Sequence, residues 1–104
     1  MVLSVVKYNI HPDKAEAFQA WVQRTIPRIL ALAGVVEFRA YRPASGSWQI
    51  VTTTEFGDMA AWANVISGDV WQQINNELHT LALDIEVEVW GPSPVVPKPL
   101  RPGN

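Results

Sequence analysis

The residues best suited to chemistry lie on one stripe of a segment with helical periodicity. Trp71, Asn75 and His79 are spaced four residues apart, so a helix places them on the same face. An imidazole and an amide beside a flat aromatic ring suit the binding and polarisation of a planar substrate. We therefore take His79 as a candidate acid–base or polarising group and Asn75 as its companion. The alternative is that His79 is a partly exposed helix residue with no catalytic role.

Two other sets of titratable residues were candidates for chemistry. Glu86 and Glu88 are two apart on one predicted strand, and paired carboxylates can share acid–base work. The alternative is that they are edge-strand charges, which block pairing with other sheets and are neutralised by Lys7 or Arg39. His11 lies at a helix start, where a histidine is usually a surface or capping residue. Two histidines without cysteine give no recognisable metal pattern, so no metal site is expected.

Aromatic residues are the main candidates for a binding pocket between the helices and the sheet. The residues that could line it are Tyr8, Tyr41, Trp48, Trp62 and Trp71. Aromatic residues at core spacing usually fill a core, and Trp21 and Trp62 are assigned to packing. The predicted substrate-binding residues are Tyr8, Trp48, Trp71, Arg39 and Tyr41.

The hydrophobic periods predict the elements that position these residues. A period of two alternates with a period near 3.6 in the order strand, helix, strand, strand, helix, strand, the split βαβ plan. Pro12 begins the first helix, Gly34 ends it, and Pro27 should kink or split it. The second helical element is capped by Asp58 and interrupted at Gly68. The predicted ranges are strands 2–10, 35–42, 47–56 and 84–90 and the interrupted helix 58–83.

This order predicts a ferredoxin-like α+β fold with an antiparallel sheet in strand order 4-1-3-2. Two helices cover only one face of such a sheet. The other face should carry a mixture of charged, aromatic and aliphatic side chains, among them Lys7, Glu37, Arg39, Tyr41 and Val51. A purely solvated face would hold fewer aliphatic residues, so we expect it to pack on a second copy of the chain. The alternative is an ordinary wet face.

Composition bounds the remaining possibilities. The chain has 104 residues, 48% of them hydrophobic, with a net charge of −2 and no cysteine. No basic patch is present, so nucleic acid is not an expected partner. No apolar run reaches membrane-spanning length and no signal peptide is recognised, so we expect a cytoplasmic protein without a membrane partner. Residues 1–91 should form one domain. Residues 92–104 are rich in proline and should form an extended arm.

Two segments carry a resemblance to a known superfamily. The segment TIPRILALAGVVEFRAY is similar to the end of the first helix and the second strand of NIPSNAP-like chains. The segment TTTEFGDMAAWANVISGDVWQQI resembles the strand, turn and helix that follow, with an acidic–aromatic pair and a tryptophan in the helix. With the order of elements, these segments resemble the dimeric α/β-barrel superfamily over residues 1–91. That superfamily includes the antibiotic-biosynthesis-type monooxygenases, the Dabb proteins and the NIPSNAP-like proteins.

The resemblance implies a function as well as a fold. Cofactor-free monooxygenases of this superfamily hold an electron-rich substrate that itself activates oxygen. Haem-degrading members carry a tryptophan and a histidine on the second helix, and here Trp62 matches the tryptophan but Asn75 stands at the histidine position. We therefore expect no cofactor and a homodimer that binds a hydrophobic, aromatic small molecule, with oxygenation as the reaction class. A non-enzymatic carrier or sensor and a purely structural oligomerisation module are the alternatives.

Overall fold

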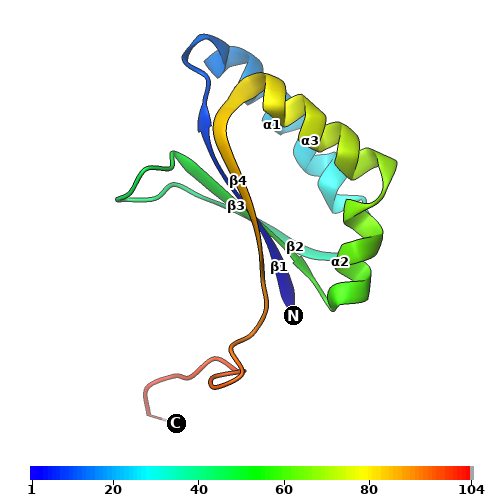
Figure 1. Ribbon diagram of the computed structural model, residues 1–104, viewed down its shortest axis with the longest axis vertical. Helices are drawn as coiled ribbons and strands as arrows, with labels where there is room; N and C mark the ends of the chain where they lie inside the picture. Colours follow the sequence, from blue (N-terminus) through cyan, green and yellow to red (C-terminus); the bar gives the residue numbers. More distant parts are fainter. Residues whose placement is uncertain (104) are drawn as a thin grey trace.

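The computed structural model describes residues 1–103 (Figure 1). The described part of the chain forms a four-stranded sheet, three α-helices and one short 3-10 helix. In chain order the elements are β1 (Val2–Ile10), η1 (Pro12–Lys14), α1 (Ala15–Leu30), β2 (Val35–Tyr41), β3 (Ile50–Phe56), α2 (Met59–Ile66), α3 (Asp69–Leu81) and β4 (Ala82–Trp90).

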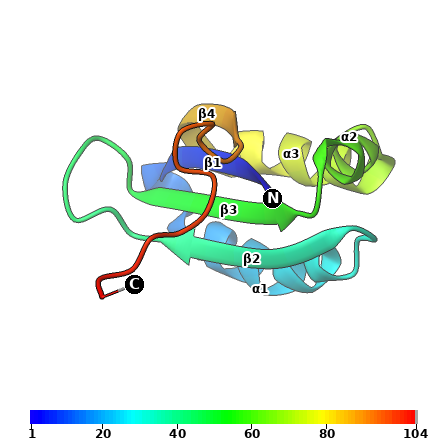
Figure 2. The ribbon, with the colours of Figure 1, turned by 90° about the horizontal axis from the view of Figure 1, so that it is seen from below.

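The sheet has the predicted topology. Its strand order is β2-β3-β1-β4, and every neighbouring pair is antiparallel. The helices lie together on one face of the sheet, as Figure 1 shows from the side and Figure 2 from below. The prediction of a ferredoxin-like α+β fold is therefore confirmed, and the face opposite the helices, here called the outer face, carries no helix of the described residues.

The second helical element divides where the sequence predicts. The carboxylate of Asp58 accepts a hydrogen bond from the Ala61 N–H at 2.8 Å and so caps the start of α2. Gly68 has an extended backbone conformation and separates α2 from α3. The interruption turns the chain, so that α2 and α3 each present a face to the sheet.

Of the two outcomes expected at Pro27, a kink or a split, the split does not occur. Helix α1 continues through Pro27 to Leu30, and the N–H of Ala31 still donates to the Pro27 carbonyl at 3.1 Å. Proline removes one backbone hydrogen bond. Burial of Thr25 and Ile29 on either side keeps the helix in one piece, because both side chains must face the sheet.

Three predicted strand boundaries are also corrected. Strand β2 ends at Tyr41 rather than residue 42. Strand β3 begins at Ile50 rather than residue 47, because the N–H of Gln49 donates to the side chain of Asn9 at 2.8 Å instead of joining the ladder. Strand β4 begins at Ala82 rather than residue 84, because Ala82 already pairs with Ile10 directly after α3.

A bulge in β4 sets which of its side chains face the helices. The register against β1 shifts between Lys7 and Asn9, and Asp84 has φ of +57°. The Asp84 carboxylate accepts a hydrogen bond from the Asn9 amide at 3.2 Å, which holds the bulge. Beyond it, Val87 turns toward the helices while Glu88 pairs with Lys7 on the outer face.

No helix within residues 1–103 combines the length and the hydrophobicity that are needed to cross a bilayer. Residues 91–103 form no helix or strand and extend past the end of the sheet (Figure 1).

Replacing Asp58 tests the capping account. Asp58→Ala removes the acceptor for the Ala61 N–H and should lower the free energy of unfolding by about 1 kcal/mol in urea titrations. Asp58→Asn keeps an acceptor oxygen and should stay close to the parent protein. Equal stability of all three proteins would contradict the capping role.

Candidate functional site

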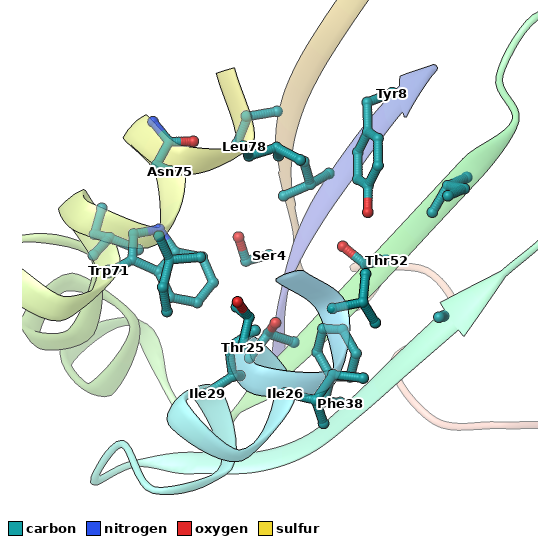
Figure 3. Close-up of a pocket in the computed structure, with 18 of the residues that line it drawn as sticks. Ser4, Tyr8, Thr25, Ile26, Ile29, Phe38, Thr52, Trp71, Asn75 and Leu78 are labelled. Atoms are coloured by element: carbon teal, nitrogen blue, oxygen red, sulfur yellow. The ribbon is translucent and has the colours of Figure 1, made fainter. Parts of the chain in front are cut away.

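A cavity of about 370 Å³ lies between the helices and the inner face of the sheet (Figure 3). It is surrounded by side chains from every helix of the described residues except η1 and from all four strands. Most of these side chains are apolar, as in sites for small organic ligands. The lining residues are Ser4, Val6, Tyr8, Phe18, Trp21, Val22, Thr25, Ile26, Ile29, Phe38, Ala40, Ile50, Thr52, Thr54, Trp62, Ile66, Trp71, Gln72, Ile74, Asn75, Leu78, Val87 and Val89.

Short side chains on the sheet create this space. Ser4, Ala40, Thr52 and Thr54 occupy positions on the inner face of β1, β2 and β3, where a filled core would hold leucine, isoleucine or phenylalanine. The opposing helices contribute large residues that keep the two layers apart. The cavity therefore follows from the volumes of side chains that face one another.

The cavity is nearly free of ionisable groups. Among residues 1–103, no Asp, Glu, Lys, Arg or His lines it, and its titratable side chain is Tyr8. Tyr8 is buried at 4% exposure, and burial raises its pKa to about 12. Its hydroxyl points toward that of Thr52 in Figure 3. At neutral pH the phenol is therefore a neutral hydrogen-bond donor, and a neutral ligand suits this interior better than a charged one.

A polar clamp holds the roof of the cavity. The indole N–H of Trp21 on α1 and the guanidinium of Arg28 both donate to the same Glu77 oxygen on α3, at 2.7 and 2.8 Å. The hydrogen bond from Arg28 and then that from Trp21 lower the pKa of Glu77. The clamp fixes the Trp21 ring on the cavity wall and ties the two long helices together.

Two polar atoms on the cavity wall have no partner. The Thr25 hydroxyl and the Trp62 indole N–H are both buried without a hydrogen bond within the described part of the chain. Buried polar groups in proteins are nearly always paired, so each unpaired one needs an explanation. Thr25 could not be selected from the sequence, since a threonine within an amphipathic helix looks like an ordinary core position.

The cavity opens along the β4 edge of the sheet. Val87 and Val89 line it and yet are 56% and 42% exposed, and the Gln72 side chain opposite them on α3 is also exposed. An entrance therefore lies on the side of β4 and α3. Asn75, which is half-buried on α3, stands between this entrance and the interior.

The structure brings some of the predicted site residues together. Tyr8, Trp71 and Asn75 all line the cavity, on β1 and α3 (Figure 3). His79 does not line it. The imidazole is exposed, and its Nδ1 lies 2.8 Å from the backbone carbonyl of Asn75 one turn earlier. Asn75 and His79 therefore lie on the same helix, but the side chain of Asn75 faces the cavity and that of His79 faces solvent.

The expectation that Tyr41 and Trp48 line a pocket between helices and sheet is wrong. Tyr41 lies in a second hollow of about 480 Å³ on the outer face, and so does Arg39, which is paired with Glu37. Trp48 lies near the ammonium group of Lys7, whose Nζ is 6.0 Å from the ring centroid. Strand alternation places Arg39 and Tyr41 opposite Phe38 and Ala40, which do line the cavity.

The outer face has its own ordered contacts. Lys7 Nζ lies 3.3 Å from a Glu88 oxygen and 5.8 Å from the ring centroid of Trp90. Hydrogen bonds from the Trp90 indole and then from Lys7 lower the pKa of Glu88. This contact agrees with the interpretation of Glu88 as a neutralised strand charge. The hollow beside it, here called the outer hollow, is lined by Met1, Leu3, Glu37, Arg39, Tyr41, Val51, Thr53, Glu55 and Trp90.

No group of three or more His, Cys, Asp or Glu side chains placed to hold a metal ion occurs within residues 1–103.

A family model described as antibiotic biosynthesis monooxygenase matches residues 1–77. The chain belongs to the antibiotic biosynthesis monooxygenase family. The match covers all the elements from β1 to most of α3, which supply most of the cavity wall. The predicted resemblance to this superfamily is thereby confirmed. A comparison with curated protein sequences found no match.

Solved structures share this fold at low sequence identity. Rv0793 of Mycobacterium tuberculosis is 18% identical with a TM-score of 0.72, covering 88% of this chain and 94% of that chain. A Dabb family protein with a ferredoxin-like fold from Mesorhizobium loti is 14% identical, with a TM-score of 0.76 and coverage of 88% and 96%. A variant of SnoaB, a cofactor-independent oxygenase of Streptomyces nogalater, is 18% identical, with a TM-score of 0.73 and coverage of 93% and 97%.

The buried phenol predicts a loss of stability at high pH. The unfolded chain ionises Tyr8 near its ordinary pKa of 10, whereas the folded protein keeps it neutral up to about 12. The free energy of unfolding should therefore fall as pH rises from 10 to 12, by about 2–3 kcal/mol in total from this residue.

Urea titrations across this pH range measure the effect. Tyr8→Phe removes the titrating group and should flatten the decline. Tyr41→Phe removes the tyrosine of the outer hollow and leaves Tyr8 in place, so it should keep the decline of the parent protein. The same decline in all three proteins would contradict the assignment to Tyr8.

Proposed function

We propose that this protein is a cofactor-independent monooxygenase-type enzyme that binds a neutral, hydrophobic, aromatic small molecule in the cavity between helices and sheet. The observation that carries the proposal is the cavity itself, with its apolar wall, its few neutral hydrogen-bonding groups and its entrance at the β4 edge. Membership of the antibiotic biosynthesis monooxygenase family supports the reaction class. The description of SnoaB as a cofactor-independent oxygenase supports the absence of a cofactor.

The reaction requires a substrate that supplies its own electrons. An activated methylene group, flanked by aromatic rings and conjugated with a carbonyl, gives up a proton and transfers electrons to O₂. One oxygen atom then becomes a new carbonyl and the other leaves as water, so that R₂CH₂ and O₂ give R₂C=O and H₂O. In this scheme the protein orients the substrate, and neutral donors such as Tyr8 and Asn75 stabilise the negative charge that develops as oxygen reacts.

Asn75 is the stronger catalytic candidate, although the imidazole of His79 is the better acid or base. Asn75 lines the cavity beside its entrance, so its amide is available to a bound substrate. His79 lies outside and would act on the substrate only if α3 turned or the substrate reached beyond the entrance. Tyr8 and Trp71 form the wall against which the ring system lies.

Oxygen uptake with anthrone tests this assignment, because anthrone is a planar ketone with an activated methylene group. We expect the protein to consume one O₂ per anthrone without added cofactor. Asn75→Ala should lower kcat/KM by about tenfold or more, and His79→Ala by less than about twofold. Loss of activity in His79→Ala with normal activity in Asn75→Ala would overturn the assignment to the cavity.

A ligand carrier is the second candidate function. The specific observation in its favour is that, within residues 1–103, the cavity is lined by no acid or base other than the neutral Tyr8. A carrier would bind planar aromatic molecules without taking up oxygen, so the same experiment separates the two functions.

The proposed active form is a homodimer in which two sheets pack through their outer faces. Tyr41 and Trp90 are 48% and 45% exposed there, and the outer hollow beside them mixes Leu3 and Val51 with charges of both signs. Exposed aromatic surface of this kind favours association with a second copy. Arg39 and Tyr41, predicted to bind substrate, would then serve the interface.

Light scattering measures the mass of the assembly in solution and so tests the proposed dimer. The protein should have twice the 11.6 kDa mass of one chain. Val51→Lys places a charge in the outer hollow and should give a monomer, whereas Val70→Lys makes the same change on α3 outside both hollows and should leave the dimer intact. A mass of one chain for the parent protein at all concentrations would contradict the proposed dimer.

A further inference from the structure

The hydroxyl of Thr25 has no structural use within the described part of the chain. Thr25 is 2% exposed, lines the cavity, and its Oγ1 is buried without a hydrogen-bond partner. An unpaired buried hydroxyl destabilises a protein, because burial removes its hydrogen bonds to water and nothing replaces them. Valine has almost the same shape and would avoid that loss, so the hydroxyl itself needs a reason.

Two other hydroxyls, one at the C-terminal end of α2 and one within α3, form local hydrogen bonds to the backbone. Ser67 donates to the Ala63 carbonyl at 2.7 Å, and Thr80 donates to the Glu77 carbonyl at 2.7 Å. This bond to a carbonyl one turn earlier is the usual solution for serine and threonine in helices. Thr25 makes no such bond, and its side chain projects from α1 into the same space as that of Ser4 from β1 (Figure 3).

The surroundings of Thr25 indicate what would pair with it. Ile26, Ile29 and Phe38 line the same part of the cavity, so an apolar body fits there (Figure 3). The second unpaired atom on the wall is the indole N–H of Trp62, which can only donate. The Thr25 hydroxyl can donate or accept, whereas the Trp62 indole can only donate, so an acceptor oxygen is the ligand group that could pair with either atom.

We propose that the Thr25 hydroxyl is a specificity determinant of the cavity, donating a hydrogen bond to a carbonyl oxygen carried by a planar, apolar ligand. The inference rests on the proposed function, in that it requires the cavity to bind such ligands. A carbonyl compound gives the hydroxyl its missing partner, whereas a hydrocarbon of the same shape leaves it unpaired. Sites built this way discriminate strongly against the ligand that lacks the polar group.

Fluorenone and fluorene are the matched probes, because they differ by the carbonyl oxygen. Their dissociation constants can be measured by quenching of tryptophan fluorescence. The parent protein should bind fluorenone at least about tenfold more tightly than fluorene. Thr25→Val should bring the ratio close to one without weakening fluorene binding, and Thr25→Ser should retain the preference. Thr25→Val should also fold at least as stably as the parent, because it removes the unpaired hydroxyl.

A spectroscopic readout keeps the inference testable if Thr25→Val fails to fold. The infrared carbonyl band of fluorenone bound to the parent protein or to Thr25→Ser should lie at lower frequency than the band of fluorenone in an apolar solvent. An unshifted band, or a preference that survives in a folded Thr25→Val, would overturn the role of Thr25.

The binding data also separate this inference from the proposed function. Equal affinity of the parent protein for both probes would overturn the role of Thr25 while leaving ligand binding in the cavity intact. Absence of binding for both probes would overturn the inference and ligand binding together.

Discussion

The rest of the structure depends on a mismatch in side-chain size between the two layers. The helices present large side chains such as Trp21, Trp71 and Leu78, while the inner face of the sheet offers Ser4, Thr52 and Thr54. Protein interiors normally close such gaps, because each lost contact costs dispersion energy. Here the layers stay apart and enclose about 370 Å³. The clamp of Trp21 and Arg28 on Glu77 holds α1 and α3 together above that space.

The two faces of the sheet have separate tasks because their chemistry differs. In the described part of the chain, the cavity-lining residues of the inner face are uncharged, and their few polar groups are the hydroxyls of serine, threonine and tyrosine. The outer face holds the charges, including the contact of Lys7 with Glu88 and that of Arg39 with Glu37. Alternation along each strand separates the two sets, and the bulge at Asp84 preserves the separation in β4. An interface and a ligand site can therefore share one thin sheet.

Much of the fold could be predicted from periodicity, because burial of one face imposes a period of two on a strand and 3.6 on a helix. The capping residue Asp58 and the helix-interrupting Gly68 also predicted where α2 begins and ends. The continuity of α1 through Pro27 could not be predicted, since it depends on tertiary burial of Thr25 and Ile29.

The site was predictable only in part. Tyr8, Trp71 and Asn75 were selected by residue type and spacing, and they line the cavity. Tyr41 and Trp48 were grouped with them as aromatic residues, although alternation along the strand already placed Tyr41 on the outer face. The unpaired hydroxyl of Thr25 has no local signature. It becomes visible only when β1 and α1 are seen to face the same empty volume.

A crystal structure of the protein grown with fluorenone is the most direct test of the cavity as a ligand site. The account predicts flat density between α1, α3 and the sheet, with the carbonyl oxygen within hydrogen-bond distance of Thr25 Oγ1. Helices collapsed onto Ser4, Thr52 and Thr54, with side chains filling the space and no ligand between the layers, would contradict it.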